Sequence, residues 1–363
     1  MRRRGPRRGR PRRARRRSPR RPRREAAVIV RPLQPADRAR WDAYVRARPD
    51  SHFAQRTAWM DLVTDAYRLP ARWWLAEEGG TVRGVLPLFE VPGRRLFSAP
   101  GGLLADDADT AAALLEPARA RLRDARLEWI ELRDQRTEWP GLATNREHVT
   151  LELALAADAD AQWKAFDAKL RNQVRKGEKS GFTARWGHAH AGDFHRVLLE
   201  NMRDLGTPIR GPAYYRRALE LFGDDADVLV LDLAGAPAGA MFVVWHGDVA
   251  MDPWASSLRR HFARCPNHVL YWEAIRRAVA RGARRFDFGR SQWGSGTFAF
   301  KASWGAVPVP LFYQYALGRA ARVPTLADQK RSLDLAVRVW RRLPVAVAGA
   351  LGERVKRLFP EAL

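Results

Sequence analysis

An order of helices and strands that occurs twice is the feature that most constrains how this chain can fold. In the second half, residues 227–257 contain three β-rich runs separated by Ala-Gly-Ala-Pro and His-Gly-Asp, which predicts an antiparallel meander. Residues 268–283 have the apolar spacing of a helix and end at a glycine, and the alternating stretch 284–289 predicts a strand. A helical turn near 298–303 and a strand over 307–317 complete this half.

The first half follows the same order more loosely. Its meander strands are predicted at 71–80, 81–91 and 94–102, and a helix near 109–126 leads into a strand at 127–134. Further helices are predicted near 38–48, 57–67, 192–205 and 213–222. A duplicated α/β (α+β) unit with a mixed, largely antiparallel sheet explains both halves.

The repeat also predicts the domain organisation. One α/β domain is expected over residues 26–157 and a second over 158–322, followed by one or two amphipathic basic helices over 323–363. With 363 residues, 46% of them hydrophobic, the chain is long enough for two such cores.

The first 25 residues form a separate compositional region. Met1 to Arg24 contains 15 arginines and no acid, and leaves a net charge of +10 on the rest of a chain whose total is +25. Such a segment has almost nothing apolar to bury and is predicted to be disordered. It is either an arm that binds nucleic acid or anionic lipid, or a low-complexity leader read from a start codon placed too far upstream.

Several classes of site have no support in the sequence. The single cysteine, Cys265, excludes an internal disulfide and a cysteine-based zinc site, and no metal site is expected. Standard hydrolase, metalloprotease and nucleotide-loop motifs do not occur. The apolar run 343–352 is too short to span a bilayer, so we expect a cytoplasmic protein and leave peripheral membrane association open.

One basic segment and one glycine-rich loop are the candidate sites. Residues 159–179 are predicted to form one helix, on which Arg171, Arg175 and Lys176 could contact a polyanion or simply face solvent. In the loop, Asp287, Arg290 and Ser291 lie at the end of a predicted strand, where α/β sheets commonly place ligand groups.

The same loop leads to a lysine between aromatic residues. Lys301 could add a charge-assisted hydrogen bond to an anion held by the glycine-rich turn, with Phe300 and Trp304 excluding water. The alternative places these aromatic side chains in the core and the ammonium of Lys301 in solvent.

Three segments, in the expected order, resemble the FemAB family of aminoacyltransferases. LRNQVRKGEKSGF at 170–182 resembles a basic helix of that family, PNHVLYWEAIRRAVARGARRFDFG at 266–289 its C-terminal half, and FKASWG at 300–305 its closing motif. NMRDLGTP at 201–208, followed by two tyrosines, resembles the subgroup found with PEP-CTERM/exosortase and exopolysaccharide systems. The similarity extends over roughly Val28 to Leu358.

The resemblance implies two tandem GNAT-like (acyl-CoA N-acyltransferase-type) domains and a transfer reaction. In such enzymes an aminoacyl group moves from aminoacyl-tRNA to an amine of a phosphate-bearing peptidoglycan precursor. The resemblance assigns Lys301 to the phosphates and the reaction centre with Phe300 beside it, and adds Thr207 and Tyr214 as substrate contacts. Asp287 is a second catalytic candidate, as a base.

These observations lead to one preferred function and two alternatives. We expect an N-acyl or aminoacyl transferase acting on an amine of a peptidoglycan or exopolysaccharide precursor, with no tightly bound cofactor and with aminoacyl-tRNA or acyl-CoA as donor. The first alternative is an acyl-CoA-dependent N-acetyltransferase of a small amine. The second is an RNA-binding protein that acts through its basic tail.

Overall fold

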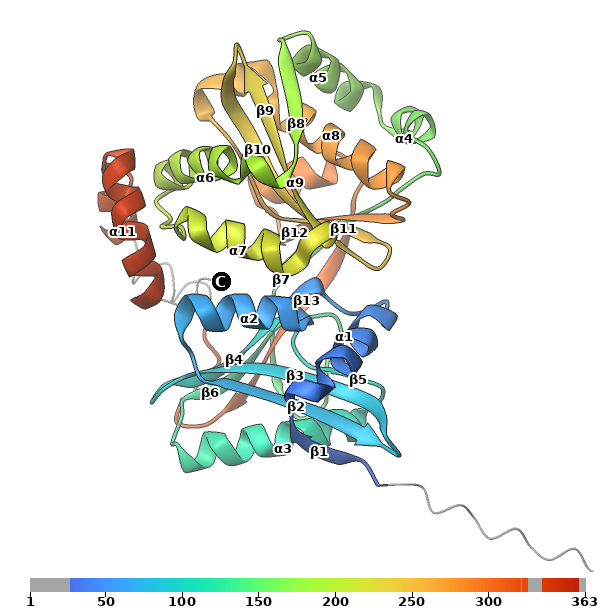
Figure 1. The fold of residues 1–363 in the computed structure, drawn as a ribbon, viewed down its shortest axis with the longest axis vertical. Helices are drawn as coiled ribbons and strands as arrows, with labels where there is room; N and C mark the ends of the chain where they lie inside the picture. The colour runs from blue at the N-terminus through green and yellow to red at the C-terminus, as the bar shows by residue number, and fades with distance from the viewer. Residues whose placement is uncertain (1–26, 321, 326–334, 359–363) are drawn as a thin grey trace, which may run out of the picture.

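A computed structural model describes residues 27–320, 322–325 and 335–358. The predictions for the Arg-rich tail, and those for parts of the C-terminal segment, lie outside these residues. Two lobes are stacked along the long axis, with a helix against the side of the upper lobe near its junction with the lower one (Figure 1). The lower lobe is the N-terminal half and the upper lobe the C-terminal half.

The upper lobe confirms the predicted order of the second half. Strands β9 (Ala226–Leu233), β10 (Ala236–His246) and β11 (Val249–Ser257) form the antiparallel meander. Helix α8 (Pro266–Ala280) then returns the chain, so that β12 (Arg285–Gln292) lies parallel to β11.

The lower lobe repeats this arrangement, as predicted. Strands β2 (Ala71–Glu78), β3 (Thr81–Val91) and β4 (Arg95–Pro100) form its meander, and α3 (Ala108–Asp124) brings β6 (Trp129–Gln135) parallel to β4. The remaining main elements are β1 (Ile29–Pro32), α1 (Arg38–Ala47), α2 (Thr57–Tyr67), β5 (Leu104–Ala105), β8 (Phe182–Trp186), α6 (Ala191–Leu205), α7 (Pro212–Phe222), α9 (Gly296–Ala302) and α11 (Val345–Leu358).

The prediction of one helix over residues 159–179 is wrong. The segment forms two helices, α4 (Ala159–Ala165) and α5 (Ala168–Glu178). The Asp167 carboxylate accepts a hydrogen bond from Leu170 N at 2.6 Å and starts the second helix. The Arg171 guanidinium donates to the carbonyls that end the first one, so a local side-chain cap overrides continuous apolar spacing.

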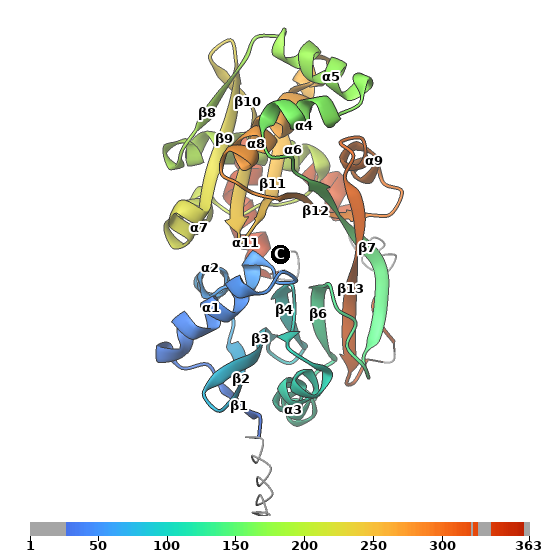
Figure 2. The ribbon, with the colours of Figure 1, turned by 90° about the vertical axis from the view of Figure 1, so that its right-hand side faces the viewer.

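Two long strands join the lobes, because each half of the chain contributes one strand to the sheet of the other half. Strand β7 (Ala143–Ala154) follows the N-terminal half in sequence but pairs with β12 of the C-terminal half, and β13 (Val307–Leu317) of the C-terminal half pairs with β6. The two strands also pair with each other. One continuous sheet results, in the order β1-β2-β3-β4-β6-β13-β7-β12-β11-β10-β9-β8. Figure 2 shows β7 and β13 running side by side along both lobes.

Side-chain alternation along the upper sheet separates two cores. Phe242 faces a core that contains α6, α7 and α2, whereas its neighbours Met241 and Val243 face a core with α5 and α8. The first core crosses the lobe boundary, where Trp59 of α2 stacks on Trp254 of β11 at 5.9 Å.

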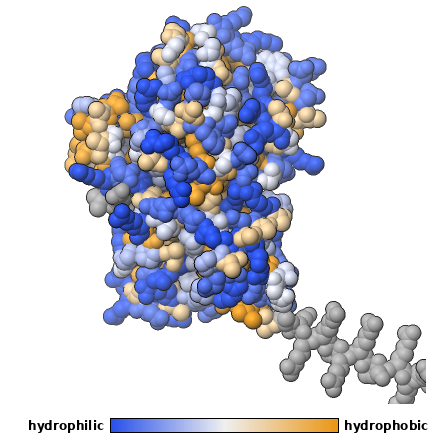
Figure 3. Space-filling view, in the orientation of Figure 1, coloured by the Kyte–Doolittle hydropathy of each residue, from blue (hydrophilic) through white to orange (hydrophobic). Residues whose placement is uncertain are grey.

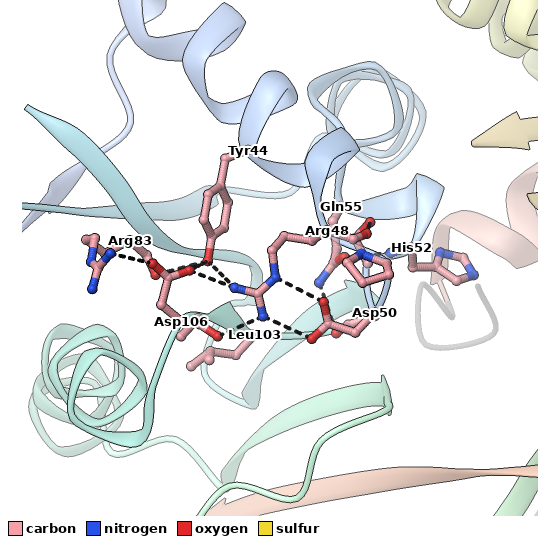
Figure 4. A network of polar contacts seen from close by, with 12 residues as sticks. Tyr44, Arg48, Asp50, His52, Gln55, Arg83, Leu103 and Asp106 are labelled. Atoms are coloured by element: carbon pink, nitrogen blue, oxygen red, sulfur yellow. Dashed lines mark hydrogen bonds and ion pairs between the residues drawn. The ribbon is translucent and has the colours of Figure 1, made fainter. Parts of the chain in front are cut away.

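The loop between α1 and α2 forms part of the contact between the lobes. Arg48 holds this loop by donating to Asp50 at 3.1 Å and to Asp106 at 2.7 Å (Figure 4). Ser51, which follows Asp50 in the loop, contacts the upper lobe: its Oγ lies 2.8 Å from His246 Nε2. A short ion-pair network in one lobe therefore positions a contact to the other.

The exchange predicts that a domain boundary placed at residue 157 does not give an independent C-terminal unit. A fragment of residues 158–320 lacks β7, so β12 and β13 lose a shared hydrogen-bonded neighbour, and we expect no cooperative thermal unfolding by circular dichroism. A fragment of residues 143–320 retains β7 and should unfold cooperatively. Equal, cooperative transitions for both fragments would contradict this role of β7.

Candidate active site

The two parallel strand pairs differ in a way that places the candidate site in the upper lobe. Strands β11 and β12 pair only as far as Met251 and Asp287 and then separate, although both continue for several residues. In the lower lobe, β4 and β6 are paired as far as Pro100 and Arg133, and Ser98 Oγ accepts from Arg133 N at 2.8 Å. The upper lobe therefore has a gap in the pairing of its parallel strands, whereas in the lower lobe the pairing resumes after a register shift between Phe97 and Pro100.

A bulge in β12 lies at this gap. Pairing with β7 shifts register between Asp287 and Arg290, and Gly289 has φ = 71°, a conformation that favours glycine. The bulge is fixed by a hydrogen bond from Gly289 N to Asp287 Oδ1 at 2.8 Å. It turns the carbonyls of Gly289 and Arg290 toward Lys301, whose Nζ donates to them at 2.8 and 3.1 Å.

Lys301 is held in a buried position by a short helix. Helix α9 begins at a Ser295 cap, whose Oγ accepts from Phe298 N at 3.1 Å. Lys301 is only 8% exposed, and burial lowers the pKa of its ammonium while the nearby carboxylates of Asp252 and Asp287 oppose that shift. The alternative in which the Lys301 ammonium lies in solvent is therefore wrong.

Asp252 on β11 is the most unusual group beside the lysine. One carboxylate oxygen, Oδ2, accepts from Tyr271 Oη at 2.6 Å. The other, Oδ1, is buried and has no hydrogen-bond partner among the described residues. Burial raises the pKa of Asp252 to about 7, against the attraction of Lys301. Half-satisfied buried carboxylates of this kind are typical of functional sites.

Asp287, in contrast, is fully engaged. Its Oδ1 accepts from Thr150 Oγ1 and from the Gly289 amide, and its Oδ2 accepts from Arg136 Nη2 at 2.8 Å. It is 1% exposed. These contacts suit a residue that fixes the bulge and links the lobes better than one that accepts a proton.

Two aromatic residues near Lys301 in sequence, Phe300 and Trp304, pack against other rings. The Trp304 side chain is 1% exposed and packs on Phe166, and Phe300 packs on Tyr271 and His268, so both rings belong to the aromatic packing of the upper lobe.

Arg290 extends the polar site toward the central strands. Its guanidinium donates to Tyr313 Oη and lies 3.9 Å from Asp134. Tyr313 in turn stacks on His148 of β7, with ring centroids 4.4 Å apart. Ser291 Oγ and His148 Nδ1 are buried without a hydrogen-bond partner in the described part of the chain, so they could bind polar groups of a ligand.

The remaining predicted site residues lie elsewhere. Arg175 of α5 stacks on Trp163 at 5.4 Å and Lys176 is exposed on the same helix, which packs against α8. Tyr214 belongs to the core on the opposite face of the sheet from Lys301, and Thr207 lies in the turn after α6. The structure does not bring these residues to the gap.

The sequence reasoning missed Asp252, Tyr271, Arg136, Thr150 and His148. The available signal for Asp252 was an acid between an apolar strand segment and a proline, in Val-Ala-Met-Asp-Pro-Trp. Among the described helices, none combines the length and apolar character that a bilayer-spanning segment requires. Nor do three or more His, Cys, Asp or Glu side chains of the described residues gather where they could hold a metal ion.

Comparison with known proteins identifies the fold and the class. Residues 164–302 match the sequence model of the Acetyltransferase (GNAT) domain, a segment that contains α5, the meander, α8, β12 and Lys301. No curated protein matches the chain in sequence. The chain therefore has an acetyltransferase-type domain in its C-terminal half.

Solved structures extend the similarity to both halves. FemX matches with a TM-score of 0.65 over 85% of this chain and 100% of its own, at 15% identity. The C-terminal domain of a protein described as a lysylphosphatidylglycerol synthetase from Agrobacterium fabrum matches with a TM-score of 0.53, at 16% identity, over 77% of this chain and 92% of its own.

A tandem GNAT protein from the clavulanic acid biosynthesis pathway matches with a TM-score of 0.52, at 14% identity, over 82% of this chain and all of its own. At these identities the matches establish the fold, which is the predicted tandem GNAT-like one. Together with the sequence match, the fold supports an acyltransferase in general.

Proposed function

We propose that this chain is an N-acyltransferase whose reaction centre is the gap between β11 and β12, and that it acylates an amine of a phosphate-bearing cell-envelope precursor. The observation that carries the proposal is the burial of both Lys301 and Asp252, with one carboxylate oxygen of Asp252 unpartnered in the part of the chain that the structure describes. An acyl group between the separated strands would lie beside both side chains.

Asp252 would accept the proton of the attacking amine. An ammonium cannot attack a carbonyl carbon, so a base must hold the proton released as the N–C bond forms and the donor's thiolate or alkoxide leaves. Burial raises the pKa of this carboxyl toward neutral pH, where a general base is most effective. The Tyr271 hydroxyl fixes the orientation of this carboxylate through Oδ2.

Lys301 would supply fixed positive charge. Two of its three N–H bonds are used by the Gly289 and Arg290 carbonyls, which leaves one to donate to a ligand oxygen. In a buried site this charge stabilises a developing oxyanion or a substrate phosphate more strongly than in water. The contribution of Asp287 is positional, because it holds the bulge that presents those carbonyls.

The donor is proposed to be acyl-CoA, with aminoacyl-tRNA as the second candidate. Strand β11 leads into a 3₁₀ helix, Arg259–Arg264, and then into the N-terminus of α8, where exposed Arg259 and Arg264 suit a pyrophosphate. The likeness to FemX and the motifs at 170–182 and 266–289 favour an envelope precursor as acceptor. The PEP-CTERM association and the RNA-binding role of the tail stay predictions.

A donor screen separates these candidates. Single-turnover transfer to a mixture of amine-bearing muropeptide and amino-sugar nucleotides should be seen with acetyl-CoA and should be absent with aminoacyl-tRNA. Transfer from aminoacyl-tRNA alone would assign the second donor to the same site. Absence of transfer from both donors would remove the proposed activity.

Removal of the base should slow transfer and change its pH dependence. Asp252→Asn is expected to lower kcat/KM by about 10²- to 10⁴-fold, the usual contribution of a general base. At a constant concentration of the unprotonated amine, the kcat/KM of the unmodified protein should fall about tenfold per pH unit below pH 7, because the Asp252 carboxylate becomes protonated there, and the variant should lack this dependence. A variant within twofold at every pH would contradict the role of Asp252.

Removal of the cation should act on the transition state more than on folding. Lys301→Met is expected to lower kcat by about 10²- to 10³-fold, comparable to the loss of an oxyanion-stabilising donor. Lys169→Met, which removes an exposed lysine from α5, is the matched control and should retain activity. If Lys301→Met kept its activity while remaining folded by circular dichroism, the assignment of Lys301 would be wrong.

A further inference from the structure

The C-terminal helical segment, residues 335–358, docks on the upper lobe through one side. Ala348 is fully buried, and Gly352 lies so close to Ile209 that an added Cβ would be 2.5 Å from its carbonyl oxygen. The Glu353 carboxylate accepts from Arg210 Nη1 at 2.8 Å and from Gly211 N at 2.9 Å, at the start of α7. These contacts fix which side of α11 faces outward.

The outward side is apolar. On α11, Val347 is 40% exposed and Leu351 37%; in the helical stretch that precedes α11, Leu335 is 76% exposed and Val339 55%. Along α11 the exposed positions 346, 347, 350 and 351 form one face, occupied by alanine, valine and leucine. Figure 3 shows this face as an orange surface over α11 at the side of the molecule. A helix face in water normally carries polar residues, so this surface indicates a partner.

Exposed cations occur in the same segment as the apolar surface. The segment contains six Arg or Lys residues and one Glu, a formal charge of +5. The side chains of Arg338, Arg341, Arg342 and Arg354 are exposed. Exposed apolar residues beside cations in a helical segment are the features by which such segments bind in the plane of an anionic membrane surface.

We propose that the outer face of residues 335–358 is a docking surface for an anionic lipid bilayer. The segment would lie in the headgroup region, with Val347 and Leu351 inserted and the arginines paired with lipid phosphates. Its apolar run is too short to span, which is consistent with binding along the surface. The docked protein would meet its acceptor at the membrane if that acceptor is lipid-linked.

A second copy of the chain fits this surface less well. In a two-fold symmetric dimer the same patch would face itself and bring two segments of charge +5 together. A bilayer rich in anionic lipid supplies the opposite charge instead. The charge of the segment therefore favours lipid over self-association.

The test uses the full chain and compares vesicles of phosphatidylcholine with vesicles of phosphatidylglycerol and phosphatidylcholine in about equal parts. Flotation is measured in high salt, which suppresses electrostatic binding by the Arg-rich tail more than insertion of apolar side chains. Val347→Asp with Leu351→Asp should lower partition into the anionic vesicles about tenfold or more. Val307→Asp, at a residue 64% exposed on β13, is the matched control and should not change it.

A second readout reports on the position of the helix. An environment-sensitive fluorophore on Val347→Cys should become brighter with anionic vesicles, and the same fluorophore on Val307→Cys should not; the native Cys265 is buried and does not compete for label. Equal partition of the Asp variants and the unmodified protein, with no change at position 347, would overturn the proposal. A dimer in sedimentation that the Asp variants dissociate would assign the surface to a second copy and overturn it too.

Discussion

The pairing of β7 with β13 at the centre of the sheet determines where the functional groups of this protein can lie. Each strand belongs by sequence to one half and completes the sheet of the other. The register sets Thr150 of β7 beside Arg290 of β12, and Thr150 then donates to Asp287. Arg136, just after β6, reaches the same carboxylate from the other lobe. The bulge that positions Lys301 therefore depends on contacts from both halves.

The buried ammonium of Lys301 needs polar groups close by to compensate for its loss of water. Transfer of an ammonium from water to the interior costs several kcal/mol unless other groups solvate it. Two backbone carbonyls do so here, and the charges of Asp252 and Asp287 favour the ammonium electrostatically. Asp252 keeps one oxygen without a hydrogen-bond partner among the described residues, in contrast to Asp287, whose oxygens are all engaged.

Much of the fold could be predicted from the sequence because its signals are local. The two meanders, α3, α8 and the short helix of Lys301 all follow from periodicity and glycine positions. Strand β7 was not predicted, since its first half, Ala-Thr-Asn-Arg-Glu, is polar and its pairing is entirely non-local. The break between α4 and α5 depends on the Asp167 and Arg171 caps, which periodicity does not detect.

The site was predictable only in part for the same reason. Lys301 could be selected from its aromatic neighbours and from the resemblance to the FemAB family. Asp252 could not, because one acid in a strand resembles a surface residue until the fold places it beside the lysine. Thr207 and Tyr214 are close in sequence to a recognisable motif, but the sheet separates Tyr214 from Lys301.

The central claim is that the gap between β11 and β12 holds the acyl donor beside Lys301 and Asp252. A crystal structure with a non-hydrolysable acyl-CoA analogue tests this most directly. We predict that the acyl carbonyl lies between the two strands, within hydrogen-bond distance of Lys301 Nζ, and that the pyrophosphate lies at the N-terminus of α8. An analogue bound at the paired strands β4 and β6, or on the face of the sheet that carries Tyr214, would contradict the account.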